Sequence, residues 1–195
     1  MPRKLSNPKT AALLAATTTL AACTGVTVSR VDHANQYNPF ETAAAGGGDR
    51  QMRVVVLGKP FDTPQAELEG AVIAAMQDSN FGVPLNFALD PANPDTSRPF
   101  RVVMAFNPDG IRDPGKLCEA TDNLKTASSD GGRVTLMAAF CSKESYLSHA
   151  IARAGDVGGT GSETFGDMIF QLTASLFPSR NPNDQSAGEP PLPAT

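Results

Sequence analysis

The sequence predicts an α+β domain in which a small, mainly antiparallel sheet carries helices packed on one face. Three observations predict this fold class. Runs rich in β-branched and aromatic residues recur at strand length, segments with a helical spacing of apolar residues accompany them, and clusters of Gly, Pro, Asn and Asp separate the segments. The resulting order is strand, helix, strands, helix, helix, which favours an α+β domain.

The first half of the domain is predicted to hold three strands and one helix. Residues 53–57 (RVVVL) form a β-branched run that predicts a buried strand. Thr63 as N-cap and Pro64 at the first helical position then predict a helix. The predicted inward face of this helix consists of Leu68, Val72, Ile73, Ala75 and Met76. Residues 85–89 and 100–106 (FRVVMAF) predict the second and third strands, with a Pro- and Asp-rich turn between them.

The second half is predicted to hold one further strand and two helices. Residues 133–140 (RVTLMAAF) predict the strand, and Ser142 predicts the N-cap of a helix that Gly155 closes. The inward face of that helix would consist of Tyr146, Leu147, Ala150, Ile151 and Ala154. Ser162 predicts the N-cap of a last helix, which Pro178 ends. Its inward face would consist of Phe165, Met168, Ile169, Leu172 and Leu176.

Composition predicts where this domain begins and ends. Residues 23–51 are small and polar and include three Ala followed by three Gly, which is typical of a flexible tether. Residues 178–195 contain five Pro and almost no large apolar side chain, which predicts a disordered tail. The α+β domain is therefore expected to span residues 52–177.

The N-terminus has the organisation of an export signal. Residues 1–10 form a basic segment with Arg3, Lys4 and Lys9 and no acidic residue. The apolar segment Ala11–Ala22 follows, and its 12 residues are fewer than the roughly 20 that a membrane-spanning helix needs. Residues 1–22 are thus predicted to be a signal peptide, and no later segment is predicted to span a membrane.

The end of that segment, Leu20-Ala21-Ala22-Cys23, resembles the lipobox of bacterial lipoproteins, which is a Leu and two small residues before a Cys. The resemblance covers about 23 residues and implies cleavage before Cys23 with acylation of its sulfur and its new amine. Several acyl chains give stable anchoring, since one chain alone binds a bilayer only marginally. The alternatives are an ordinary cleaved signal peptide and a cytosolic apolar N-terminus. Thr24 follows the Cys where Asp would imply retention in the inner membrane, which favours the outer membrane.

The charge of the mature chain limits its partners. Without residues 1–22, the chain keeps 13 of its 16 basic residues against 20 acidic ones. Nucleic acid is an unsuitable partner for such a chain, because neutralising phosphates requires clustered Lys and Arg. The expected partners are the lipid bilayer, through acylated Cys23, and other proteins of the cell envelope.

Acylation of Cys23 would leave two further cysteines in an oxidising compartment. A turn at Asp130-Gly131 would place Cys118 nearly opposite Cys141 on two neighbouring strands. We therefore predict a disulfide between Cys118 and Cys141. A redox or metal-binding pair is disfavoured because the chain has no CxxC spacing and only two His. Two free, buried thiols remain an alternative.

No motif in the chain carries recognisable chemistry. Ser145 and His149 would share a helical face, but no GxSxG turn and no orienting acid accompany them. The loop 155–162 is Gly-rich and precedes a helix, but Glu163 stands where a phosphate-binding loop would not place an acid. A calcium site is conceivable at Asp109, Asp113, Glu119 and Asp122, but the alternating pattern of a calcium-binding loop is absent. The sequence thus predicts no catalytic residue, no metal ligand and no cofactor.

These observations favour a lipid-anchored envelope protein with a non-catalytic role in binding or assembly. It would face the periplasm from a bacterial membrane. A periplasmic protein that binds a small ligand is the first alternative, and an apolar-lined pocket would favour it. A hydrolase is the second alternative, and it would require Ser145, His149 and an acid to meet in a cleft.

Overall fold

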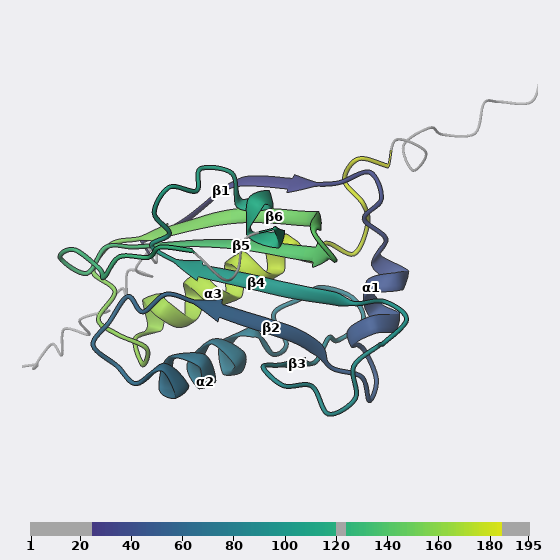
Figure 1. Cartoon of the computed structure of the whole chain (residues 1–195), viewed down its shortest axis with the longest axis horizontal. Helices are drawn as coiled ribbons and strands as arrows, with labels where there is room; N and C mark the ends of the chain where they lie inside the picture. Colours follow the sequence, from purple (N-terminus) through teal and green to yellow (C-terminus); the bar gives the residue numbers. More distant parts are fainter. Residues whose placement is uncertain (1–24, 120–123, 185–195) are drawn as a thin grey trace, which may run out of the picture.

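The computed structural model describes residues 25–119 and 124–184 and places six strands in one sheet (Figure 1). The strands are β1 (Val26–His33), β2 (Met52–Leu57), β3 (Phe87–Ala88), β4 (Phe100–Phe106), β5 (Val134–Ser142) and β6 (Ser145–Ala154). Their order across the sheet is β1-β6-β5-β4-β2-β3. The pairings of β1, β6, β5 and β4 are antiparallel, whereas β4, β2 and β3 run parallel. The predicted α+β class with a mainly antiparallel sheet is confirmed.

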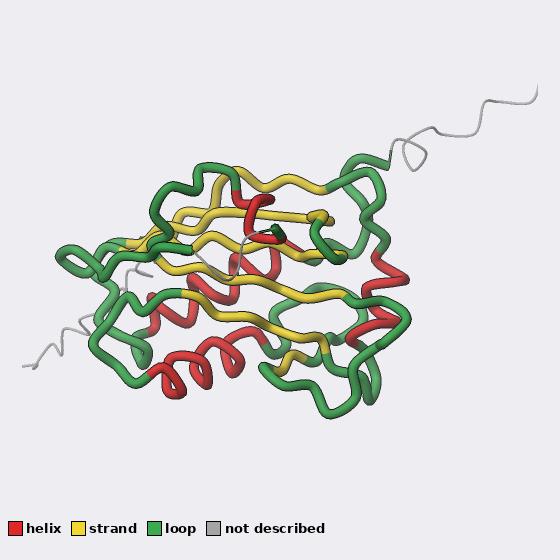
Figure 2. The backbone as a smooth tube through the Cα atoms, viewed as in Figure 1, coloured by secondary structure: helices red, strands yellow, loops and turns green. Residues whose placement is uncertain are grey.

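Helices cover one face of this sheet. They are α2 (Gln65–Met76) and α3 (Glu163–Leu176), whereas α1 (Pro39–Gly46) lies at one end of the sheet and the short 3₁₀ helix η1 (Pro114–Cys118) lies on the other face. In Figures 1 and 2, α2 and α3 lie behind the sheet, and α1 lies at one end of it. Within the described residues, none of the helices has the length and apolar character needed to cross a bilayer.

Strand β4 shows why the sheet has two cores. Alternate side chains of a strand point to opposite faces. Val102, Met104 and Phe106 pack into the core under α2 and α3, whereas Val103 and Ala105 pack into a second, smaller core under η1. Because both faces are covered, β4 is apolar over most of its length, as its sequence is.

Several predicted elements are confirmed with small changes of boundary. Strands β2, β4 and β5 and helix α3 lie where the sequence places them, and the Ser162 hydroxyl accepts a hydrogen bond from the Phe165 N–H at 3.2 Å. Helix α2 is also present, but its N-cap is Pro64, without a side-chain hydrogen bond, and Thr63 does not cap it. The predicted strand at 85–89 is reduced to the two residues of β3.

The prediction of a tether over residues 23–51 is wrong for the described part of that segment. β1 is an edge strand that pairs with β6, and α1 follows it, begun by the Asn38 side chain as N-cap. Close packing explains two of the small residues at the end of α1, because a Cβ on Gly47 would lie 2.6 Å from the Ala43 carbonyl oxygen and one on Gly46 would lie 3.2 Å from the Met52 side chain. A composition that is typical of flexible linkers therefore includes residues that an ordered, closely packed helix end requires.

The helix predicted between Ser142 and Gly155 is also wrong, because residues 145–154 form β6. β5 and β6 join in a tight hairpin, with Lys143 in the turn at φ 54°. The pairing shifts between Phe140 and Cys141, which leaves Leu147 as an extra residue, as in a β-bulge. A central strand buried on both faces lacks the alternation that identifies a strand, and its apolar spacing therefore matched that of a helix.

The C-terminal segment is ordered further than the sequence predicts. Residues 178–184, assigned to the disordered tail, lie against the loop between β1 and α1. The Asn181 side-chain amide donates to the backbone oxygens of Ala34, Asn35 and Tyr37 at 3.0–3.3 Å. The remaining part of the predicted tail, residues 185–195, lies outside the described residues.

Candidate functional site

The two ends of the sheet are distinguished by the residues of β1 that lie there. Cys23 and the signal peptide lie outside the described residues, which start at Gly25. Val26, the first residue of β1, pairs with Ala154 at the end of β6, and Ala154 pairs in turn with Val134 at the start of β5. We call this the Val26 end of the sheet. The opposite end of β1, at His33, is the His33 end, where α1 also lies (Figure 1).

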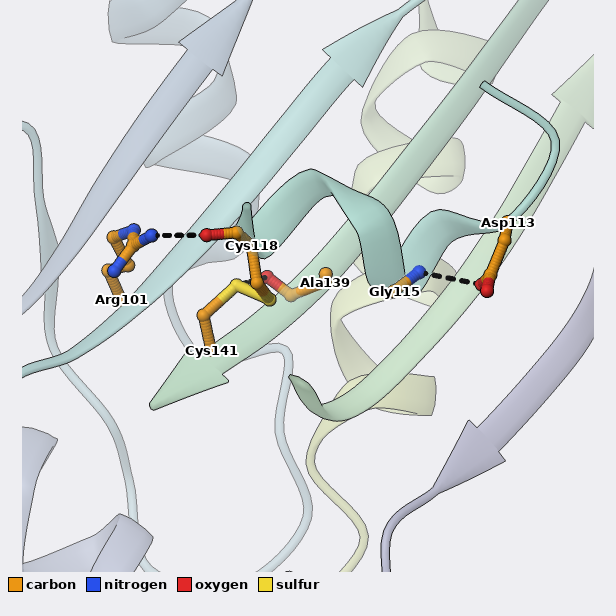
Figure 3. Close-up of a disulfide and its surroundings, with 6 residues drawn as sticks. All are labelled: Arg101, Asp113, Gly115, Cys118, Ala139 and Cys141. Carbon is orange, nitrogen blue, oxygen red and sulfur yellow. Dashed lines mark hydrogen bonds between the residues drawn. A yellow bond between two sulfur atoms is a disulfide. The ribbon is translucent and has the colours of Figure 1, made fainter. Parts of the chain in front are cut away.

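The predicted disulfide between Cys118 and Cys141 is present and connects η1 to β5. The two Cα atoms lie 5.6 Å apart, and both residues are buried. Figure 3 shows Cys118 on η1 and Cys141 on the strand below it. The prediction of the pair is confirmed, but its reasoning is not, because Cys118 lies on a 3₁₀ helix that packs over the sheet and not on a neighbouring strand.

Two polar contacts support this disulfide. The Asp113 carboxylate accepts a hydrogen bond from the Gly115 N–H at 3.0 Å and so caps η1 (Figure 3). At the other end of η1, the Arg101 guanidinium donates to the Cys118 backbone oxygen at 2.8 Å. The disulfide and these two hydrogen bonds therefore hold η1 against the sheet.

A polar cluster of Asp32, Asp113, Tyr146 and His149 lies on the same face as η1. The Tyr146 hydroxyl donates to Asp32 at 3.0 Å, and this bond is the main reason why the pKa of Tyr146 is raised. The buried His149 ring has its Nε2 atom 3.8 Å from a carboxylate oxygen of Asp32 and 3.8 Å from one of Asp113. Its Nδ1 atom is buried without a hydrogen-bond partner.

This arrangement does not assemble a catalytic nucleophile. Ser145 and His149 lie on β6, not on a helix, and within the described residues no hydrogen bond joins them. A distance of 3.8 Å from His149 Nε2 to either carboxylate is also too long for a hydrogen bond. The cluster instead connects β6 to β1 through the hydrogen bond from Tyr146 to Asp32, and it places His149 beside Asp113 at the start of η1.

An open acidic hollow of about 560 Å³ lies beside this cluster. Its lining includes Asp32, Asp113, Glu119, Glu144 and Tyr146. The lining residue Lys116 lies 2.8 Å from Glu119 and compensates one of these carboxylates. The hollow would therefore favour positively charged groups over anions.

The conceivable calcium ligands do not converge. Asp113 is occupied as the cap of η1, Glu119 is paired with Lys116, and Asp122 lies outside the described residues. Among the residues that the structure describes, no group of three or more His, Cys, Asp or Glu could hold a metal ion. The Gly-rich loop at 155–162 connects β6 to α3, and its Ser162 hydroxyl is used as the helix cap.

The most strongly shifted carboxyl group of the described residues is structural. The buried Asp95 carboxylate accepts hydrogen bonds from the Ser97 hydroxyl at 2.6 Å and from Arg98 at 3.0 Å, and Arg50 lies 2.9 Å away. These contacts, the Ser97 bond first among them, hold the pKa of Asp95 well below its usual range. They fix the turn between β3 and β4.

Sequence reasoning missed an exposed apolar surface at the His33 end. Phe40 on α1 is 86% exposed, and Phe81 and Val83, in the loop after α2, are 67% and 56% exposed. Together with Tyr37 and Phe177 they line an apolar hollow of about 160 Å³. The sequence signal was Asn38-Pro39, an N-cap followed by Pro at the first helical position, which would have placed Phe40 on a short helix.

Comparisons with known proteins assign no family. No family model and no curated protein matches the chain. Among solved structures, the chain is similar to the dodecamer of a PelC point variant from Paraburkholderia phytofirmans, with 13% sequence identity and a TM-score of 0.39. The match covers 80% of this chain and 99% of that chain. A TM-score this low carries no inference about fold or function.

Proposed function

We propose that this chain is a bacterial envelope lipoprotein, held to a membrane by acylated Cys23 and serving a non-catalytic role in binding or assembly. The lipobox-like Leu20-Ala21-Ala22-Cys23 supports the anchor, and Thr24 after it favours the outer membrane. The domain would face the periplasm, a compartment in which the disulfide between Cys118 and Cys141 is stable.

The strongest support for this proposal is that β1 begins shortly after Cys23 in the sequence. Two residues lie between Cys23 and Val26, and the three steps from one to the other span about 10 Å in a fully extended chain. An acylated Cys23 would therefore hold the Val26 end of the sheet close to the bilayer. The eight residues of β1 then place the His33 end about 23 Å further along the strand.

The two ends differ in the surface that they would offer. Near the Val26 end, the charged side chains Asp130 and Arg133 pair with each other at 2.8 Å. The exposed aromatic side chains Phe40 and Phe81 lie at the His33 end, away from the proposed anchor. Exposed apolar patches of this kind mark interaction sites, and this one would face a protein partner and not the anchoring bilayer.

The apolar hollow is smaller than a typical ligand site. Its volume of about 160 Å³ is below the 300–1,000 Å³ that sites for small molecules usually have. The acidic hollow and a hollow of about 940 Å³ beside the apolar one are larger, but both are open and lined mainly by polar residues. Contact with a protein surface is therefore the better-supported form of binding.

Substitution of Cys23 tests the anchor. The Cys23→Ala chain is expected to leave the membrane fraction and to lose labelling by a palmitate analogue, whereas Thr24→Ala is expected to retain both. A Cys23→Ala chain that still fractionates with membranes and is still labelled would exclude the lipoprotein.

Substitution of Phe81 tests the binding surface. Proteins cross-linked to the wild-type chain in intact cells are expected to be lost with Phe81→Asp and kept with Phe170→Asp, which adds the same charge at another exposed aromatic residue, on α3. Identical cross-linked proteins with both variants would show that the apolar surface is not the binding site.

A further inference from the structure

The apolar hollow adjoins a larger hollow at the point where the described chain ends. The second hollow measures about 940 Å³, and its lining includes Tyr37, Pro39, Phe40, Ser179 and Asp184. The first four of these residues also line the apolar hollow. The described chain therefore ends at Asp184 on the wall of a depression that leads to Phe40.

The chain leaves this wall in a defined position. The Asn181 side chain donates to the backbone oxygens of Ala34, Asn35 and Tyr37, and the Asn183 side chain donates to the His33 backbone oxygen. The Tyr37 hydroxyl donates to the Pro178 oxygen at 2.9 Å. These bonds attach the C-terminal segment to the His33 end of the sheet, so everything after Asp184 starts from there.

The segment after Asp184 has the composition of a groove-binding sequence. Residues 185–195 read QSAGEPPLPAT and contain three Pro around Leu192, which is the only large aliphatic residue among them. Pro-rich segments favour the polyproline II conformation and dock in grooves lined by aromatic residues at low entropic cost. Phe40, Phe81 and Phe177 supply such a lining.

The segment is also long enough for Leu192 to reach the apolar hollow from Asp184. Leu192 is eight residues after Asp184, which corresponds to about 25 Å in polyproline II conformation. A shorter span suffices for a segment that starts on the wall of a hollow to which Phe40 itself contributes. Attachment in the same chain gives the segment a millimolar effective concentration at the site, which a separate chain does not have.

We propose that residues 185–195 bind back onto their own domain and place Leu192 in the apolar hollow, between Phe40 and Phe81. The docked segment covers the exposed aromatic surface at the His33 end. Any protein that uses this surface must displace the segment, which makes the segment an intramolecular competitor for the site. The docking itself does not depend on the anchor at Cys23.

The chain contains no Trp, so that Phe81→Trp creates a single fluorescent reporter at the hollow. The exposed position of Phe81 makes this substitution compatible with folding. Three full-length chains carry the reporter: one with the natural C-terminus, one with Leu192→Asp, and one with Ala187→Asp. The last is the matched control, since it adds the same charge to the same segment outside the Pro-rich part.

The expected result is a shift of Trp emission to longer wavelength and stronger quenching by acrylamide with Leu192→Asp only. Identical emission from all three chains would overturn the proposal. Emission that depends on protein concentration, and not on residue 192, would assign the surface to a second copy of the chain. Emission that changes only when lipid vesicles are added would assign it to a lipid surface, and either result would overturn the proposal.

Discussion

The two faces of the sheet are closed by different physical means. On one face, α2 and α3 together bury several large apolar side chains, which include Leu68, Phe165 and Leu172. On the other face, η1 has five residues and buries one large aliphatic side chain, Leu117, and the disulfide of Cys118 holds η1 in place. Apolar burial suffices for a long helix, whereas a single turn requires a covalent bond in addition.

The largest expected effect is on the helix-covered face. Phe106 is fully buried and stacks on Phe165 at 5.9 Å between ring centres. Phe106→Ala is expected to lower the free energy of unfolding by about 3–5 kcal/mol, because it removes buried surface and leaves a cavity. Denaturant unfolding measures this, with exposed Phe170→Ala as the control. A loss of similar size in both variants would contradict the stated role of this core.

The next effect concerns the face covered by η1. Replacing Cys118 and Cys141 together by Ala is expected to lower the free energy of unfolding by about 3 kcal/mol, since the bond closes a loop over a sequence separation of 23 residues. Hydrogen exchange should also accelerate in η1 and β5 more than in α3. Uniform acceleration across both faces would show that they are not held independently.

The smallest expected effect is on the pH dependence of the free energy of unfolding. Two histidines, one on each face of the sheet, allow the faces to be compared. On the helix-covered face, burial is the main reason why the pKa of His33 lies below its usual value, while its Nε2 atom contacts the Ser175 oxygen at 3.0 Å. The folded chain therefore resists protonation that the unfolded chain accepts near pH 6.5. The contribution of His33 to stability is complete above pH 6.5 and is lost as the pH falls below it.

Binding of this one proton changes the free energy of unfolding by at most about 1.4 kcal/mol per pH unit. Denaturant unfolding between pH 7.5 and pH 5 measures it. His33→Gln is expected to reduce the slope, whereas His149→Gln, on the face that η1 covers, should retain the part due to His33. An unchanged slope in His33→Gln would assign the pH dependence to other groups.

Sequence reasoning succeeded where the residue types and the apolar pattern of a segment are typical of one kind of element. β2 and β4 are continuous apolar runs, and α3 has one apolar face with a Ser cap, so their patterns match their structures. It failed for β6, because that strand is rich in Ala and Ser, has Ile151 as its one β-branched residue and carries a bulge at Leu147 that interrupts its alternation. The pair Cys118 and Cys141 was predicted correctly from a wrong arrangement, since proximity alone permits a disulfide.

The candidate surfaces were harder to predict than the fold. Cys23 could be predicted as a lipidation site because the lipobox-like segment is a local pattern of four residues, and it stays a prediction. The apolar hollow could not be found in this way, because Phe40, Phe81 and Phe177 come from three distant segments and none of them is unusual by itself. The polar cluster likewise required Asp32, Asp113 and His149 to meet from three elements.

The sequence by itself determined the α+β class, the position of most core elements and the predicted site of lipid attachment. These properties depend on local periodicity, caps and short motifs, which are read within one segment. The tertiary structure alone decided that residues 26–46 belong to the domain, that β6 is a strand, and that exposed aromatic side chains gather at the His33 end of the sheet. Each of these depends on which neighbour a segment meets, and no single segment contains that information.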